Sequence, residues 1–237
     1  MKIVVLVKQV PDSTEITVDK VTGTLVRDGV PSIINPDDLA GLEAALELKD
    51  KDPSINVTVV SMGPPQAKGM LQETIARGAD EAYLLTDRRL GGADTCATSR
   101  TLAAALKKIG YDLIIAYVDE IIELTPEKVT VKKALEDEEQ ILTAKMPCVL
   151  TTLSGMNKPR YMNCNDIVDS FNNPVKIMTF DDLDLDQSVV GLAGSPTKVH
   201  ATFTKDVSAE TQTYNMPAKE TAELIAKTLK EKQLITK

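Results

Sequence analysis

The most constraining feature of this sequence is a repeated pattern of short apolar runs separated by amphipathic stretches. Four runs have the length and composition of buried strands: Ile3–Val7, Ile55–Val60, Glu81–Leu85 and Asp112–Ala116. The stretches between them carry apolar residues at helical spacing over roughly ten to fifteen residues. This alternation predicts an α/β fold, a doubly wound and mostly parallel sheet with helices on both faces.

The pattern changes after Tyr117. Strand-like runs follow without helical spacers, and we expect them to form an antiparallel extension of the sheet: Val118–Leu124, Val129–Ala134, Gln140–Ala144 and Cys148–Thr152. A polar loop at about 152–174 leads to an extended arm that ends in an amphipathic helix at Pro217–Leu234. We therefore expect a nucleotide-binding type of α/β domain at 1–190 and a C-terminal arm and helix at 191–237.

One junction breaks the expected topology. A parallel strand that ends at Ala116 needs a crossover of a dozen or more residues before the next parallel strand. Instead the chain runs from Ala116 through Tyr117 to Ile122 without a turn residue. Either this is one long strand, or a crossover is missing from the chain.

The inventory of charged and reactive residues excludes several classes of function. There are 27 basic and 35 acidic residues, a net charge of −8, which argues against binding nucleic acid or an anionic membrane surface. The single histidine, His200, and three scattered cysteines, Cys96, Cys148 and Cys164, form no metal or catalytic motif. The cysteines fit a reducing cytoplasm, and the N-terminal apolar run is too short for a signal peptide or a membrane span.

The predicted sheet directs attention to the carboxyl ends of its strands, where parallel sheets bind ligands. Segments after Val7, Val60 and Ala116 would line such a crevice. Met62–Pro65 is either an ordinary strand–helix turn or a contact for a phosphate or ribose. Asn35–Asp38 is first of all a helix start, with Asn as the N-cap and Pro in the first turn, and a ligand role is the alternative. Neither common phosphate-loop signature is present.

Several segments together resemble the β subunit of electron-transfer flavoproteins. The similarity covers nearly the whole chain and rests on Val7–Asp12, Ile34–Asp38, Val60–Pro65, Ala76–Asp80, Gly92–Thr95, Val131–Lys133, Glu136–Glu138 with Gln140 and Leu142, Pro147–Thr151, Asn157–Tyr161 and Gly194–Thr197.

The resemblance implies a heterodimer with an α subunit that holds most of the redox-active FAD. The β subunit's own crevice would hold AMP, or a second FAD in members that bifurcate electrons from NADH, with ferredoxin as a further acceptor. The start of the chain and Gly92–Thr95 look most like members from strict anaerobes, which favours the bifurcating type. The implied cofactor contacts are Leu6, Asn35, Pro36, Asp37, Asp38, Met62 and Ala116.

The resemblance also implies that residues 152–174 dock on a flavin-dependent dehydrogenase. At the centre of this loop lie Arg160, Tyr161, Cys164 and Ile167. Arg and Tyr are residue types that anchor protein interfaces. The lysine-rich stretch of many relatives is replaced here by Asp169–Asn173, which leaves the identity of the dehydrogenase open.

The main departure from the family pattern falls at Ala116–Tyr117. Relatives carry there a segment that cradles the nucleotide phosphates, followed by a crossover helix. Either the segment is deleted from this protein, or it is missing only from the chain as given. A true deletion predicts severely weakened nucleotide binding.

These observations favour an electron-carrier subunit of an oxidoreductase complex. Such a subunit positions flavins and needs no general acid or nucleophile, because the cofactor supplies the redox chemistry. The alternatives are a non-bifurcating β subunit that holds AMP structurally, and a stand-alone adenine-nucleotide-binding module.

Overall fold

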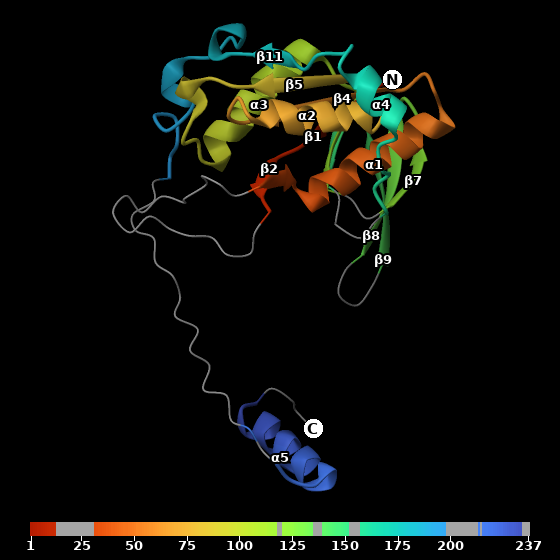
Figure 1. The fold of residues 1–237 in the computed structure, drawn as a ribbon, viewed down its shortest axis with the longest axis vertical. Helices are drawn as coiled ribbons and strands as arrows, with labels where there is room; N and C mark the ends of the chain where they lie inside the picture. The colour runs from red at the N-terminus through yellow and green to blue at the C-terminus, as the bar shows by residue number, and fades with distance from the viewer. Residues whose placement is uncertain are drawn as a thin grey trace. The chain divides into compact units, whose positions relative to one another are not determined.

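Short β-branched runs pair side by side into a six-stranded sheet at the centre of the fold (Figure 1). The computed structural model describes residues 1–12, 31–117, 120–134, 139–151, 157–197, 213 and 215–233. His200, residues 152–156 of the expected docking loop and most of the arm lie outside them. All neighbouring strands of the sheet run parallel, in the order β10 (Cys148–Thr151), β6 (Leu113–Tyr117), β1 (Lys2–Leu6), β4 (Asn56–Met62), β5 (Glu81–Leu85) and β11 (Lys176–Met178).

Helices cover both faces of this sheet, which confirms the expected doubly wound architecture. Helices α1 (Pro36–Lys51) and α2 (Ala67–Ala76) pack on one face, here called the α1 face, and α3 (Thr95–Ile109) packs on the other, the α3 face. Successive strand residues point to opposite faces, so Ile3 and Val5 enter the core beneath α1 while Val4 enters the core beneath α3. Because both faces are buried, the strands read as continuous apolar runs.

The antiparallel strands form a sheet of their own. Strands β7 (Glu120–Leu124), β8 (Lys128–Ala134) and β9 (Glu139–Lys145) pair consecutively and, among the described residues, form a sheet separate from the central one. The fourth expected run, Cys148–Thr152, instead contributes Cys148–Thr151 to the central sheet as β10, parallel to β6. The open edge of β6 explains this outcome, since β10 satisfies backbone groups there that would otherwise lack partners.

The antiparallel sheet takes the place of a crossover helix between β6 and β10. Strand β6 ends at Tyr117 and β7 begins at Glu120. Val129 of β8 is fully buried in the core of the α1 face, where Ile121 and Val131 also pack. The connection between the two parallel strands therefore runs along the α1 face.

The remaining elements are short. Strands β2 (Gln9–Pro11) and β3 (Ser32–Ile34) form an antiparallel pair, and α4 (Cys164–Ser170) lies in the loop expected to dock a partner. Three single-turn helices, η1 (Arg88–Leu90), η2 (Phe180–Asp182) and η3 (Gln187–Val189), complete the first of two contact units, 1–200 and 201–237. In the second unit, α5 (Ala218–Glu231) is strongly amphipathic. No helix in the described part of the chain has both the length and the hydropathy to cross a bilayer.

Candidate functional site

Three of the expected cofactor contacts lie on one edge of the sheet. Leu6 ends β1 beside Val60 of β4, and Met62 ends β4 two residues further on. On the other side of β1, Val5 pairs with Ile115, so Ala116 follows at the level of Leu6. Leu6 and Met62 both pack against the core of the α3 face. The parallel topology thus brings together residues that are far apart in the sequence.

The start of α1 is tied to the end of β1 by two backbone hydrogen bonds at Lys8. The N–H of Asn35 donates to the Lys8 carbonyl at 2.9 Å, and the N–H of Lys8 donates to Oδ2 of Asp38 at 2.7 Å. Asn35 is the N-cap residue, as expected, although its side chain makes no capping hydrogen bond, and Pro36 stands in the first turn. Asn35–Asp38 therefore reaches the same strand-end region as Leu6.

The electrostatics of this helix start disfavour anions. Asp37 and Asp38 both lie in the first turn of α1, and Pro36 has no N–H to offer. Burial raises the pKa of the Asp38 carboxyl to about 6, although the N–H of Lys8 and the side chain of Asn35 oppose this shift. Carboxylate oxygens can accept hydrogen bonds from hydroxyl or amino groups, such as those of a ribose or an adenine, but they repel phosphate.

Ser61 is a polar residue at this edge that sequence reasoning missed. It is 2% exposed, and its Oγ has no hydrogen-bond partner among the residues that the structure describes. A buried hydroxyl is normally hydrogen-bonded. Its signal in the sequence was a serine near the end of a buried strand, between Val60 and Met62.

The start of α2 offers no phosphate site. The three amides of its first turn donate to carbonyls of the preceding turn, Ala67 to Pro64 at 2.9 Å, Lys68 to Pro65 at 3.2 Å and Gly69 to Gln66 at 3.3 Å. Amides spent in this way cannot also hold an anion. The turn at Met62–Pro65 thus behaves as a strand–helix connection.

The start of α3 is also unavailable to a phosphate, because a carboxylate already occupies it. One carboxylate oxygen of Asp94 accepts the N–H of Ala97 at 2.9 Å, while the other accepts the N–H and Oγ1 of Thr197 at 3.0 and 2.8 Å. These hydrogen bonds hold the pKa of Asp94 below its usual range, which fixes a negative charge at this helix start. In the described part of the chain, these three helix starts present carboxylates or already bonded amides, which do not suit the phosphates of a nucleotide.

The expected docking loop is held firmly on the first unit, and Arg160 is the centre of its attachment. The Arg160 guanidinium donates to Oε1 of Glu43 at 2.9 Å and to Oδ2 of Asp50 at 2.6 Å, both on α1. Its backbone N–H donates to Oε2 of Glu43 at 2.9 Å, and its carbonyl accepts a hydrogen bond from Arg77 on α2. The pKa of Asp50 is lowered by the hydrogen bond from Arg160.

Further hydrogen bonds extend this attachment over residues 157–173, here called the docking segment. The Asn157 side chain donates to the carbonyl of Ala40 at 3.0 Å, and the Asn173 side chain donates to that of Asp80 at 2.6 Å. Gln72 on α2 donates to the carbonyl of Ser170 at the end of α4. The docking segment is therefore an ordered surface element and not a loose loop.

Apolar side chains on the docking segment point to solvent. Tyr161 is 95% exposed, Phe171 72%, Val168 65% and Ile167 39%. Cys164 is exposed at the first position of α4. The sequence had indicated Tyr161, Cys164 and Ile167, whereas Phe171 was not singled out although it is an aromatic residue in a polar stretch. Clustered exposed apolar residues mark interaction surfaces.

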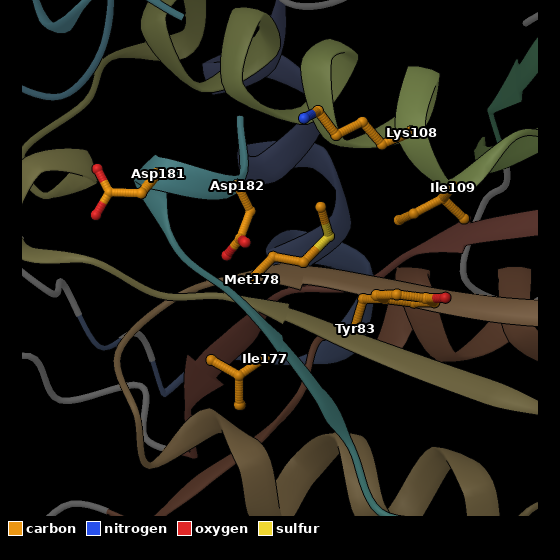
Figure 2. Close-up of a pocket in the computed structure, with 7 residues that line it drawn as sticks. All are labelled: Tyr83, Lys108, Ile109, Ile177, Met178, Asp181 and Asp182. Atoms are coloured by element: carbon orange, nitrogen blue, oxygen red, sulfur yellow. The ribbon is translucent and has the colours of Figure 1, made fainter. Parts of the chain in front are cut away.

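A shallow depression of about 430 Å³ lies elsewhere, on the α3 face. Figure 2 shows Lys108 and Ile109 of α3 opposite Tyr83 of β5 and Met178 of β11. Its charged lining groups already have partners: Lys108 pairs with Asp184, Asp181 with Arg89, and Asp182 accepts from Thr179. The depression is lined by none of the expected cofactor contacts, and no group of His, Cys, Asp and Glu in the described ranges could hold a metal ion.

Comparison with known proteins finds many relatives, three of which are described here. The chain is 45% identical to the electron transfer flavoprotein subunit beta of Clostridium acetobutylicum, with 99% of this chain and 100% of the relative aligned. It is 43% identical to the caffeyl-CoA reductase-Etf complex subunit CarD of Acetobacterium woodii (86% and 87% aligned). It is 35% identical to the acryloyl-CoA reductase electron transfer subunit gamma of Anaerotignum propionicum (86% and 88% aligned).

The alignments also reveal a difference in length within the chain. The Clostridium alignment has 261 positions, but 99% of 237 residues is about 235, so about 26 positions have no residue of this chain. The Acetobacterium alignment has 230 positions against about 204 residues, which again leaves about 26.

A family comparison agrees with the relatives. The family described as electron transfer flavoprotein domain matches residues 22–121. This range includes β4 and β6, the two strands beside β1, and ends within β7. With 45% identity over nearly its whole length, the chain belongs to the electron transfer flavoprotein family as a β subunit.

Proposed function

We propose that the chain pairs with an α subunit and carries electrons between a flavin-dependent dehydrogenase acting on CoA esters and a second acceptor. The observation that carries this proposal is the ordered docking segment with its exposed apolar residues. Two of the three relatives described above are named for CoA-ester reductases, which supports the class of dehydrogenase. We place the complex in the cytoplasm, as expected from the cysteine content.

In this function the chain's own residues dock and orient, and a bound flavin supplies the redox chemistry. Tyr161 and Phe171 would enter apolar pockets of the dehydrogenase, with Ile167 and Val168 beside them. Arg160 would support this surface from below, because its guanidinium is already bonded to Glu43 and Asp50. The cytoplasmic partner is thus recognised mainly by aromatic and aliphatic contacts, the types that dominate interface energetics.

The experiment is to co-express the chain with its α subunit and measure flavin reduction by an acyl-CoA dehydrogenase. Tyr161→Ser and Phe171→Ser should raise the KM for the dehydrogenase severalfold or more while kcat stays within about twofold. Leu192→Ser is the matched control, because Leu192 is 62% exposed but lies outside the docking segment. Unchanged KM in both docking variants, or failure of the two subunits to co-purify, would contradict the proposal. A stable monomer that binds adenine nucleotides without an α subunit would favour the stand-alone module.

The cofactor stoichiometry distinguishes the finer alternatives. A bifurcating complex with NADH and ferredoxin needs a second FAD in this chain, and a non-bifurcating complex of the usual kind needs AMP there. Both ligands carry phosphates, which the described strand ends do not accommodate. We therefore propose the simplest carrier, with one FAD per αβ pair held by the α subunit. Two FAD per pair would instead identify the bifurcating type.

A further inference from the structure

We propose that the strand-end region of this chain has lost its phosphate-binding half, so that the β subunit holds neither AMP nor a FAD of its own. The lost part is the crossover between β6 and β10. This inference rests on the proposed carrier function and deepens it, since it gives the structural reason why the flavin is held by the α subunit alone.

The first argument is that each helix start at the described strand ends is unsuited to a phosphate. The first turn of α1 has a proline and two carboxylates, and the first-turn amides of α2 donate to carbonyls of the preceding turn. The start of α3 is occupied by the Asp94 carboxylate and Thr197. Phosphate sites in α/β folds rely on free amides and the positive end of a helix dipole. No helix start follows β6 directly among the described elements, since the next one is β7.

The second argument is the direction of the connection that follows β6. From β1 through β4 to β5 the chain advances along the sheet in one direction, with α1 and α2 on the α1 face. From β6 to β10 it advances in the opposite direction, so a right-handed crossover would lie on the α3 face. The antiparallel sheet instead packs into the core of the α1 face. The present connection has the rare hand, as expected if a right-handed crossover has been removed.

The third argument is an uncovered strip on the α3 face. Val149 of β10 pairs with Ile114 of β6, and the two side chains share that face. Ile114 is buried at 4% exposure, whereas Val149 is 59% exposed. Strands of parallel sheets are normally covered on both faces. Val149 therefore lies where a helix after β6 would have packed.

The fourth argument is length. About 26 aligned positions of two relatives have no residue in this chain. A parallel crossover needs a dozen residues or more, so this number is sufficient for a loop, a helix and the return to the sheet. We assign these positions to the junction between Ala116 and Tyr117, where β6 leads to β7 within three residues.

The test compares AMP with adenosine on the purified αβ complex. Nucleotides released by denaturation are quantified by chromatography, and the affinities for added AMP and adenosine are measured by calorimetry up to millimolar ligand. We expect less than 0.1 AMP per complex, no more than one FAD, and an affinity ratio of AMP to adenosine below ten. A ratio of ten or more, stoichiometric AMP, or a second FAD would overturn the proposal. Absence of measurable binding of both ligands supports it.

A gain-of-function variant tests the position of the loss. The segment of the Clostridium relative that has no counterpart here is inserted between Ala116 and Tyr117, with a Gly/Ser insertion of equal length as the control. The relative's segment should give AMP a preference of at least tenfold over adenosine, and the control should not. A folded insertion variant without this preference would refute the assigned position. If the variant does not fold, the ratio of the AMP and adenosine affinities of the unmodified complex decides the main proposal. Electron transfer from the dehydrogenase is measured separately, so failure of the carrier function would be recognised independently.

Discussion

The attachment of the docking segment through Arg160 allows a quantitative prediction. Arg160→Ala removes both guanidinium contacts and leaves the Glu43 carboxylate, only 7% exposed, without its charged partner. Breaking a fully buried ion pair costs about 3–5 kcal/mol, and the one-third exposure of the Arg160 side chain reduces this to about 2–3 kcal/mol. For a unit of this size each kcal/mol corresponds to about 2–4 °C, so we expect the Tm to fall by about 4–12 °C.

The assay is thermal and urea unfolding of the αβ complex, accompanied by hydrogen exchange of residues 157–173. The matched control is Lys128→Ala, because the Lys128–Glu123 pair joins side chains that are each about half exposed. Such a surface pair contributes at most about 1 kcal/mol. A double-mutant cycle with Glu43→Ala should give a coupling energy above about 1 kcal/mol between Arg160 and Glu43.

The reasoning would be refuted if Arg160→Ala lowered the Tm no more than Lys128→Ala does. It would equally fail if the docking segment kept its exchange protection in the variant. Arg160→Lys should recover only part of the loss, because an ammonium group cannot reach both carboxylates with the geometry of a guanidinium.

Four further substitutions test other parts of the structure. Asp38→Asn should raise the Tm at pH 7.5 and leave it unchanged near pH 4. With a pKa of about 6, the native carboxyl binds more protons than the unfolded chain between about pH 4 and 6, so its contribution to stability falls as the pH rises through this window. A pH profile of the Tm identical to that of the unmodified protein would contradict this prediction. Gly194→Ala should destabilise the first unit by at least about 2 kcal/mol in urea unfolding, because the added Cβ would lie 2.1 Å from the carbonyl carbon of Val189. The control is Gly69→Ala in α2, where the added Cβ meets open space. It should stabilise the first unit by about 0.5–1 kcal/mol. Ser61→Ala should be neutral or stabilising by up to about 1 kcal/mol, since the Ser61 hydroxyl is buried without a described partner, and a loss above 1 kcal/mol would show that it is hydrogen-bonded.

The sequence alone predicted the parts of the fold that follow from local periodicity. The four buried strands and the helices between them were identified because each carries its own apolar spacing, and Asn35–Pro36 marked the start of α1 correctly. The pairing of Cys148–Thr151 was not predictable in this way. Four residues of strand composition do not encode whether they run parallel or antiparallel, or which sheet edge is open to them.

The candidate site was predictable in position and less so in chemistry. Strand order places Leu6 and Met62 at one edge, which the βαβ pattern already implied. The environment of Arg160 depends on Glu43, 117 residues earlier in the chain, so no local pattern could show that its guanidinium is already paired. The first-turn amides of α2 are already hydrogen-bonded because of the backbone geometry of the turn at Pro64–Pro65, which no local sequence pattern specifies.

The attachment of the docking segment separates recognition from stability. Glu43 and Arg77 bind the backbone N–H and carbonyl at position 160, and Gln72 binds the carbonyl of Ser170. Backbone groups are the same whichever side chains the neighbouring positions carry. Tyr161 and Phe171 make none of these bonds in the described structure, so their side chains can be exchanged without loosening the surface that presents them, and under the proposed docking role such an exchange would change the partner.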